Sequence, residues 1–354
     1  MPRLSATPPL DGKPCGPLRA DDEVRTRDLN LGKVALYQLS YVRMRHHGSV
    51  VREERLADCN REANCRGFAR ERHWRRGAPS LVHMIAWCNG SIVDPEAPAV
   101  SVLDHGFTVG DGVFEAIKVV DNAPFALTRH LDRLGRSAHG LGLPEPDDAR
   151  IRSAIDEVLG GQHIDWGRIR ITFTAGISPL GSNRATSEPT LVVVATEAQP
   201  YPPVTKVVTV PWRRNERGAM AGLKTTAYAE NVVALAYAAE RGGSEAIFAN
   251  IAENLCEGTG ANVFCVIDGQ IVTPPLTCGC LAGITRELVV EWCDVEERDI
   301  TMAEFAQADE VFLTSTTRDV QAVSHVDDRQ FGDAPVTAKV AEVWRTREPQ
   351  DVDP

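Results

Sequence analysis

Apolar and polar residues follow a regular order from Met84 onward, and their spacing predicts strands and helices in alternation. The first block, residues 84–198, contains hairpin signals such as an Asn-Gly turn between apolar runs, and helical spacing of leucines. We therefore predict a small α+β domain here. Its predicted elements are hairpins over 84–93 and 112–127, helices over 127–143 and 147–161, and strands over 167–176 and 189–198.

A proline-rich stretch over 199–203 predicts a linker, and a second mixed α/β block follows over 204–346. Residues 347–354 remain as a tail. The predicted elements of the second block are strands over 206–212 and 245–251, a hairpin over 262–275, helices over 229–243, 284–293 and 336–348, and one strand followed by a turn over 309–327.

Composition and charge narrow the class of protein. The 354 residues carry a formal net charge of −11, which argues against nucleic-acid binding because phosphate contacts need clustered Lys and Arg. No apolar run is long enough for a membrane span, and no signal peptide is evident. The nine cysteines are scattered without a metal-ligand spacing, so we predict free thiols, no metal and a cytoplasmic location.

Residues 1–83 differ from the rest of the chain. They hold 16 Lys and Arg against 10 Asp and Glu, a net of +6, so the remainder carries −17. They also show almost no apolar periodicity. A basic arm for an anionic partner is one interpretation. We favour the other, a disordered extension or translation from a start codon placed too early.

The chain has only six lysines, and Lys224 is unlike the others. Lys118 and Lys206 lie in or beside predicted strands, where a solvated position is the simplest expectation. Lys224 is flanked by small and apolar residues just before a predicted helix. Desolvation lowers the pKa of a lysine, and a neutral amine is the nucleophile that forms a Schiff base.

Other residues could complete a cofactor site around that lysine. Glu257 lies between a predicted strand and a Gly-rich turn, where a carboxylate could hold the ring nitrogen of pyridoxal 5′-phosphate (PLP) in its protonated state. A helix start at 283–285, the hydroxyl-rich stretch 314–319 and Arg133 are each typical of a phosphate site, though each is common alone.

Taken together, six ordered segments resemble the class IV aminotransferases, which are the fold-type IV PLP enzymes. That family includes branched-chain aminotransferases, D-amino acid aminotransferases and 4-amino-4-deoxychorismate lyases. The resemblance extends over about residues 84–346. The matching segments are 104–119, 129–138, 222–235, 257–264, 273–287 and 308–317.

The resemblance implies that Lys224 binds the cofactor aldehyde and moves the proton at the substrate Cα, and that Glu257 pairs with the pyridine nitrogen. It also implies a small α+β domain, a larger α/β pseudo-barrel domain, PLP between them, and a homodimer in which the partner chain closes the pocket. The implied phosphate-binding residues are Arg133, Ile284, Thr285 and Thr316.

The reaction is less well defined. The segment 110–119 is more similar to the lyase and D-amino acid branches than to the branched-chain enzymes, and the segments 176–184 and 224–235 are similar to lyase-like members. We therefore expect a 4-amino-4-deoxychorismate lyase that forms p-aminobenzoate and pyruvate. The alternative is an amino-acid aminotransferase of the branched-chain or D-amino acid type. Three residues could contact the substrate: Arg170, Tyr228 and Asn231. Arg170 could equally be a solvent-facing strand residue, and Tyr228 could be buried by its helix.

Overall fold

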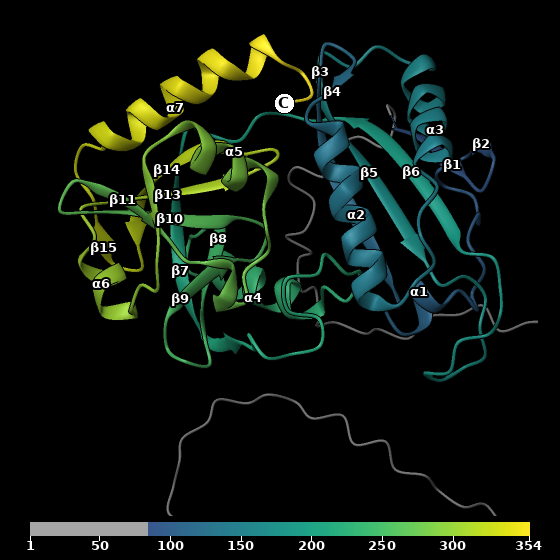
Figure 1. Cartoon of the computed structure of the whole chain (residues 1–354), viewed down its shortest axis with the longest axis horizontal. Coiled ribbons are helices and arrows are strands. Elements are labelled where there is room, and N and C mark those ends of the chain that lie inside the picture. The colour runs from purple at the N-terminus through teal and green to yellow at the C-terminus, as the bar shows by residue number, and fades with distance from the viewer. Residues whose placement is uncertain (1–83) are drawn as a thin grey trace, which may run out of the picture. The chain divides into compact units, whose positions relative to one another are not determined.

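The structure is a computed structural model that describes residues 84–354, so the predictions for residues 1–83 lie outside its range. Within residues 84–354, two β-sheets build two lobes, the small lobe before residue 198 and the large lobe after 203 (Figure 1). Helices and strands are mixed in both lobes. No helix in this part of the chain has the length and apolar character needed to cross a membrane.

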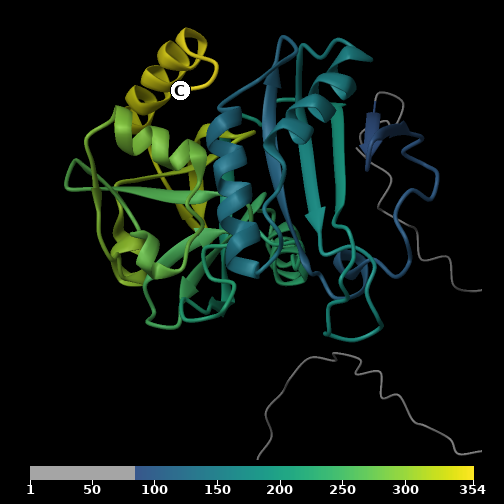
Figure 2. The same ribbon diagram turned by 45° about the vertical axis from the view of Figure 1, so that its right-hand side comes forward.

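The small lobe is a six-stranded sheet in the order β2-β1-β6-β5-β3-β4, with two helices on one face (Figures 1 and 2). Alternate residues of its strands pack against α2 and α3 and form a core with Ile117, Ile169 and Val193 at its centre. Its elements are β1 (Met84–Cys88), β2 (Ser91–Val93), α1 (His105–Thr108), β3 (Gly112–Val120), β4 (Ala123–Pro124), α2 (Leu127–Leu141), α3 (Asp148–Gly160), β5 (Trp166–Thr174) and β6 (Thr190–Glu197).

The large lobe is a nine-stranded mixed sheet in the order β12-β11-β10-β13-β14-β7-β8-β9, with β15 paired to β14. Its strands are β7 (Val204–Arg214), β8 (Glu245–Asn250), β9 (Leu255–Gly258), β10 (Asn262–Ile267), β11 (Gln270–Thr273), β12 (Val295–Glu297), β13 (Glu310–Ser315), β14 (Asp319–Val326) and β15 (Arg329–Gln330). Its helices are α4 (Ala229–Ala239), η2 (Leu276–Cys278), α5 (Ile284–Trp292), α6 (Met302–Gln307), α7 (Pro335–Arg347) and η3 (Glu348–Gln350).

Local signals account for several element boundaries. Asn89 and Gly90 both have positive φ, as the turn between β1 and β2 requires. The side chain of Asp147 accepts a hydrogen bond from Arg150 N–H and so begins α3. The predicted helix over 229–243 ends earlier, at Ala239, because the chain then turns through Gly242, whose φ is +75°.

The prediction of one strand over 309–327 is wrong, because this segment forms two paired strands, β13 and β14. The register of β14 against β7 shifts between Val323 and His325. That irregularity interrupts the alternation of buried and exposed residues, so the sequence lacks the regular period of two that identifies a strand.

The expectation that Lys118 is solvated is also wrong. Lys118 is only 1% exposed, on β3 of the small lobe. Its Nζ lies 2.5 Å from Asp319 of β14 and also pairs with Glu348 at the end of α7. The Nζ lies 5.6 Å from the centroid of the Trp344 ring. This buried cation therefore joins the two lobes.

Replacing Lys118 with methionine, which keeps much of the side-chain volume, should destabilise the fold because two carboxylates then face each other without a cation. Because both acids keep some solvent contact, we expect the free energy of unfolding to fall by about 2–3 kcal/mol, which is at or below the low end of the cost of breaking a buried ion pair. Urea unfolding measures it. Lys339→Met, on the exposed side of α7, is the matched control. Equal unfolding midpoints for the two variants would contradict the assignment.

Candidate active site

A cavity of about 360 Å³ lies among the segment before α4, the turn between β9 and β10, the start of α5 and helix α2. It brings together residues that are distant in sequence. Eight of the nine predicted site residues line it, namely Arg133, Lys224, Tyr228, Asn231, Glu257, Ile284, Thr285 and Thr316. Arg170 is the one that does not.

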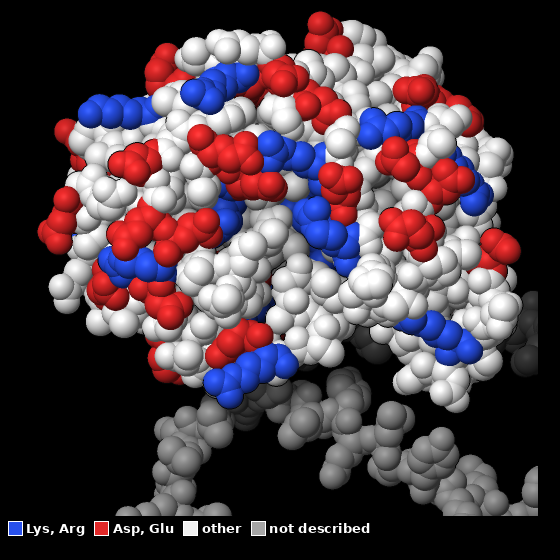
Figure 3. All heavy atoms as spheres, in the orientation of Figure 1, with Lys and Arg blue, Asp and Glu red and all other residues white. Residues whose placement is uncertain are grey.

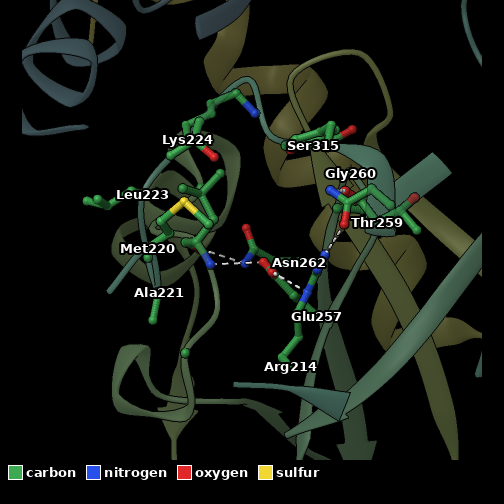
Figure 4. Close-up of a pocket in the computed structure, with 18 of the residues that line it drawn as sticks. Arg214, Met220, Ala221, Leu223, Lys224, Glu257, Thr259, Gly260, Asn262 and Ser315 are labelled. Carbon is green, nitrogen blue, oxygen red and sulfur yellow. Dashed lines mark hydrogen bonds and ion pairs between the residues drawn. The ribbon is translucent and has the colours of Figure 1, made fainter. Parts of the chain in front are cut away.

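The backbone of Lys224 is fixed on both sides. Its N–H donates to Ser137 Oγ at 3.2 Å, and its carbonyl accepts from Phe114 N–H at 3.0 Å. Gly222, at φ +73°, turns the chain just before it. The side chain extends into the cavity from the wall opposite Glu257 and Thr259 (Figure 4). Its Nζ lies 4.4 Å from the centroid of the Phe114 ring.

Burial is the main reason that the pKa of Lys224 falls to about 8. The positive charge of Arg133 lowers it further, whereas the carboxylates of Glu115 and Glu257 act in the opposite direction. At pH 7 about a tenth of such amines are neutral, far more than for a solvated lysine. The predicted desolvation of this lysine therefore agrees with its surroundings.

Glu257 faces the cavity from β9. One carboxylate oxygen accepts from Leu281 N–H at 2.9 Å, and the other lies 3.3 Å from Arg214 Nε. Burial raises the pKa of Glu257, and the charge of Arg214 and the hydrogen bond from Leu281 partly oppose that rise. The carboxylate is thus held in place while it still faces the cavity (Figure 4).

The start of α5 is a candidate anion site at another part of the cavity. Its N-cap is Gly283, which has no side chain to cap the helix, and a Cβ there would collide with the Asn262 carboxamide. The first N–H groups of the helix have no intrahelical acceptor, and the helix dipole favours an anion beside them. Among residues 84–354, the buried Thr314 hydroxyl also has no hydrogen-bond partner.

Arg133 reaches this anion site from α2, where a buried carboxylate fixes its orientation. Glu115 accepts from Arg133 Nε and Nη2, both at 2.7 Å, and is hydrogen-bonded to His130 Nδ1 at 2.7 Å. Arg133 Nη1 donates to the Ala282 carbonyl at 2.9 Å, just before α5. The Arg133 guanidinium holds the pKa of Glu115 well below its usual range despite burial.

Glu115 and His130 are site residues that the sequence did not predict. The available signal was Glu115 itself, the one carboxylate in a predicted strand whose only other charged residue is Lys118. A buried carboxylate requires a partner, and the three arginines of the following helix are the candidates.

Arg170 lies on β5 outside the cavity lining, with its guanidinium 3.9 Å from the centroid of the Phe114 ring. Lys224 Nζ contacts the same ring. Arg170 is exposed and has no ion-pair partner among residues 84–354. Desolvation of its guanidinium, which lies over the Phe114 ring, lowers its pKa even though the side chain as a whole is exposed. Both sequence interpretations, a solvent-facing residue and a residue near the substrate, are therefore compatible with its position.

Tyr228 and Asn231 differ in what they contact. The Tyr228 ring meets Phe114 edge to face with centroids 5.0 Å apart, and burial raises its pKa to about 12. Asn231 donates to the Thr259 carbonyl at 2.9 Å and accepts from Arg214. Asn231 therefore supports the arginine beside Glu257, whereas Tyr228 forms part of the wall near Lys224.

Three cysteines gather behind Glu257 in the large lobe: Cys256, Cys278 and Cys280. Cys256 Sγ and Cys278 Sγ lie 3.8 Å apart, and the cysteines of the described residues are free thiols. Within residues 84–354, no group of three or more His, Cys, Asp or Glu side chains is arranged to hold a metal ion.

A family model described as amino-transferase class IV matches residues 112–326, which is more than half of the chain. The chain belongs to the class IV aminotransferase family. The predicted resemblance is therefore confirmed. Enzymes of this family use PLP, and one similar structure, a branched-chain aminotransferase, carries an N-(5′-phosphopyridoxyl)-L-glutamate adduct. This class IV aminotransferase is thus a PLP-dependent enzyme, as expected.

Relatives with different named activities match this chain over nearly their whole length. A Methanocaldococcus jannaschii protein assigned as a branched-chain-amino-acid aminotransferase is 32% identical, with 74% of this chain and 96% of the relative covered. A D-alanine aminotransferase from Staphylococcus haemolyticus is 31% identical over 72% of this chain and 94% of the relative.

Solved structures confirm the fold. A branched-chain aminotransferase from Thermoproteus uzoniensis superposes with a TM-score of 0.70 at 31% identity, covering 74% of this chain and 94% of that one. A Legionella pneumophila protein assigned as a 4-amino-4-deoxychorismate lyase has a TM-score of 0.66 at 25% identity, covering 72% and 97%. The predicted fold class, an α+β small domain with a larger α/β domain, is confirmed.

The low pKa of Lys224 can be tested without any assumption about the reaction. In cofactor-free protein, competitive labelling with acetic anhydride, read by peptide mass spectrometry, should give a Lys224 rate that is half-maximal near pH 8. The rate rises with pH because only the neutral amine reacts. A solvated lysine peptide, with a pKa of about 10.4, is the reference. A Lys224 profile that coincides with this reference would contradict the burial argument.

Proposed function

We propose that this chain is an amino-acid aminotransferase that moves an amino group from an α-amino acid to a 2-oxo acid, with Lys224 as the catalytic lysine. The observation that carries the proposal is the shared cavity. A buried amine with a lowered pKa, a fixed carboxylate and an uncapped helix start all face it. Those three groups match the aldehyde, the ring nitrogen and the phosphate of PLP.

The cofactor's ends would be held by different parts of the large lobe and by α2. The carboxylate of Glu257 would pair with the protonated ring nitrogen, since Leu281 and Arg214 already hold it toward the cavity. Bound PLP supplies an electron sink for the bonds at the substrate Cα. The phosphate would be held by Arg133, the N–H groups of Ile284 and Thr285 at the start of α5, and the Thr316 hydroxyl.

Lys224 would attach to the cofactor aldehyde as a neutral amine and, once released by the substrate, would move the proton at Cα. A pKa of about 8 suits both tasks, because the amine can be neutral or protonated near neutral pH. The ring of Phe114 beside Nζ and the ring of Tyr228 next to it limit where the amine can lie.

The substrate carboxylate would bind toward Arg170. This guanidinium has no acidic partner among the described residues and contacts the same Phe114 ring as Lys224. An arginine can bind a carboxylate through two parallel hydrogen bonds. An amino acid held between Lys224 and Arg170 would therefore present its Cα to the lysine.

The named activities of similar proteins support an aminotransferase, because branched-chain and D-alanine aminotransferases match this chain along nearly their full length. The lyase remains the second candidate. It is favoured by the lyase-like segments at 176–184 and 224–235 and by the similarity to the Legionella protein. Lys224 would remove the Cα proton in either reaction, so the two differ only in later steps.

Purified enzyme should be offered an amino acid with 2-oxoglutarate, using L-leucine and D-alanine in turn, and separately aminodeoxychorismate alone. We expect turnover that requires the 2-oxo acid. Release of p-aminobenzoate without any 2-oxo acid, and no transamination, would instead establish the lyase. In Lys224→Ala, both the visible absorbance of covalently bound cofactor and the activity should be lost, because the attaching amine is absent.

Glu257→Gln is a second test on the same assay. The amide has the shape of the carboxylate but no charge to stabilise a protonated ring nitrogen, so turnover should fall by roughly a hundredfold while PLP still binds. Wild-type turnover in Glu257→Gln would contradict the role given to this residue.

We also propose that the enzyme is a homodimer. Exposed apolar side chains gather where α1, the loop after β5 and α4 come together, with Phe107 at 75% and Leu180 at 78% exposure. Asp104 is bridged to Ile177, and Gly110 lies against Ala227 just before α4, so these segments adjoin. Exposed apolar side chains on adjoining segments are typical of an interface. The patch consists of Phe107, Val109, Ile177, Leu180, Val232 and Val233.

The double variant Phe107→Asp, Leu180→Asp should be a monomer, because it places charges in the centre of that interface. Light scattering after size-exclusion chromatography gives the mass. Val120→Asp, an exposed valine at the other end of β3, is the matched control and should remain dimeric. A wild-type chain that is monomeric at micromolar concentration would refute the dimer.

A further inference from the structure

The last residues of the structure contact both lobes. We propose that residues 348–354, the C-terminal strap, are a positioning element for the cofactor phosphate, acting through α2 and Arg133. This inference rests on the proposed role of Arg133. In Figures 1 and 2 the C-terminus lies beside the end of α2 at which the helix begins. In this proposal the strap holds helix α2 in place, and Arg133 itself faces the anion site.

Helix α2 lacks a cap of its own. Its N-cap residue is Ala126, which adopts a left-handed φ of 53° and offers no side-chain acceptor. The first N–H groups of a helix need acceptors from elsewhere. A helix start without a local cap is therefore prone to fraying unless another segment supplies those acceptors.

The strap supplies them from 225 residues away in the sequence. Asp353 accepts from the Thr128 N–H at 2.8 Å and from the Thr128 hydroxyl at 2.5 Å. The Val352 carbonyl accepts from the Ala126 N–H at 2.7 Å. The bond from the Thr128 N–H is the one that an N-cap Asp would accept, and the carboxylate charge also suits the positive end of the helix dipole.

The strap also contacts the residue that links α2 to α5. The Pro354 carbonyl accepts from Arg129 Nε at 2.7 Å. The other guanidinium nitrogens of Arg129 donate to the two carboxylate oxygens of Glu291 on α5, at 2.8 and 3.0 Å. In Figure 3, basic and acidic side chains lie next to each other along the boundary between the lobes. Helices α2 and α5, which both contribute to the anion site, are thus tied together beside the strap.

A second route runs from the same helix turn to Arg133. His130, the next residue after Arg129, is hydrogen-bonded to Glu115, and Glu115 holds Arg133 by two hydrogen bonds. Fraying of the first turn of α2 would move His130 and loosen that arrangement. At the other end of the strap, Glu348 pairs with Lys118 of the small lobe, so the strap is fixed at both ends.

Asp353→Ala tests the proposal in full-length protein from which PLP has been removed. Dissociation constants for PLP and for inorganic phosphate should each rise by about fivefold, the loss expected for one helix cap. Hydrogen exchange of amides in the first turn of α2 should be faster. Asp353→Asn, which keeps a side-chain oxygen acceptor, should restore most of the affinity. Glu342→Ala, an exposed acid on α7, is the control and should match wild type.

Two results would overturn the proposal. One is unchanged affinity for phosphate and PLP in Asp353→Ala. The other is an equal loss in Asp353→Asn and Asp353→Ala, which would indicate a role for charge or bulk rather than for capping. Neither result depends on which reaction the enzyme catalyses. Failure of the proposed function would instead appear as wild-type protein that binds PLP and phosphate but catalyses no transamination.

Discussion

The buried ion pair between Glu115 and Arg133 is the interaction on which the rest of the site depends. A carboxylate with no solvent contact is unfavourable unless charged and neutral donors surround it, and Arg133 and His130 provide them. The pair fixes α2 on β3 and leaves one arginine nitrogen directed to the Ala282 carbonyl beside α5. It also moderates the electrostatic effect of Arg133, since Glu115 opposes the lowering of the pKa of Lys224.

Strand β3 carries much of this organisation within five residues. Phe114 faces Lys224 and Arg170, Glu115 faces α2 on the opposite side of the sheet, and Lys118 reaches the large lobe. Because successive side chains of a strand point to opposite faces, one strand can serve the cavity, the helix layer and the contact between lobes. A shift of register by one residue would disrupt all three contacts together, which ties the site to correct pairing of β3 with β5.

The site residues that the sequence predicts best are those with a local sequence pattern. Lys224 before a helix and the glycine at the start of α5 each have a meaning within a few residues, and the structure places them around one cavity. Partners distant in sequence could not be predicted in this way. Lys118 lies in an apolar run, and only the fold shows that Asp319 and Glu348 neutralise it. Asp353 likewise lies in a polar tail whose contact with α2 follows from no local pattern.

The two ends of the site are built differently, and this bears on the reaction. The proposed cofactor end consists of strand termini, a helix start and the buried ion pair. The proposed substrate end consists of Arg170 at an exposed strand position, and we place beside it the loop at 176–184, which Arg184 holds by hydrogen bonds to Asp111. Loops change more readily than strands without loss of the fold. Within one family the cofactor chemistry can therefore stay constant while substrate and product differ, and the choice between transamination and elimination would depend on the residues of this end.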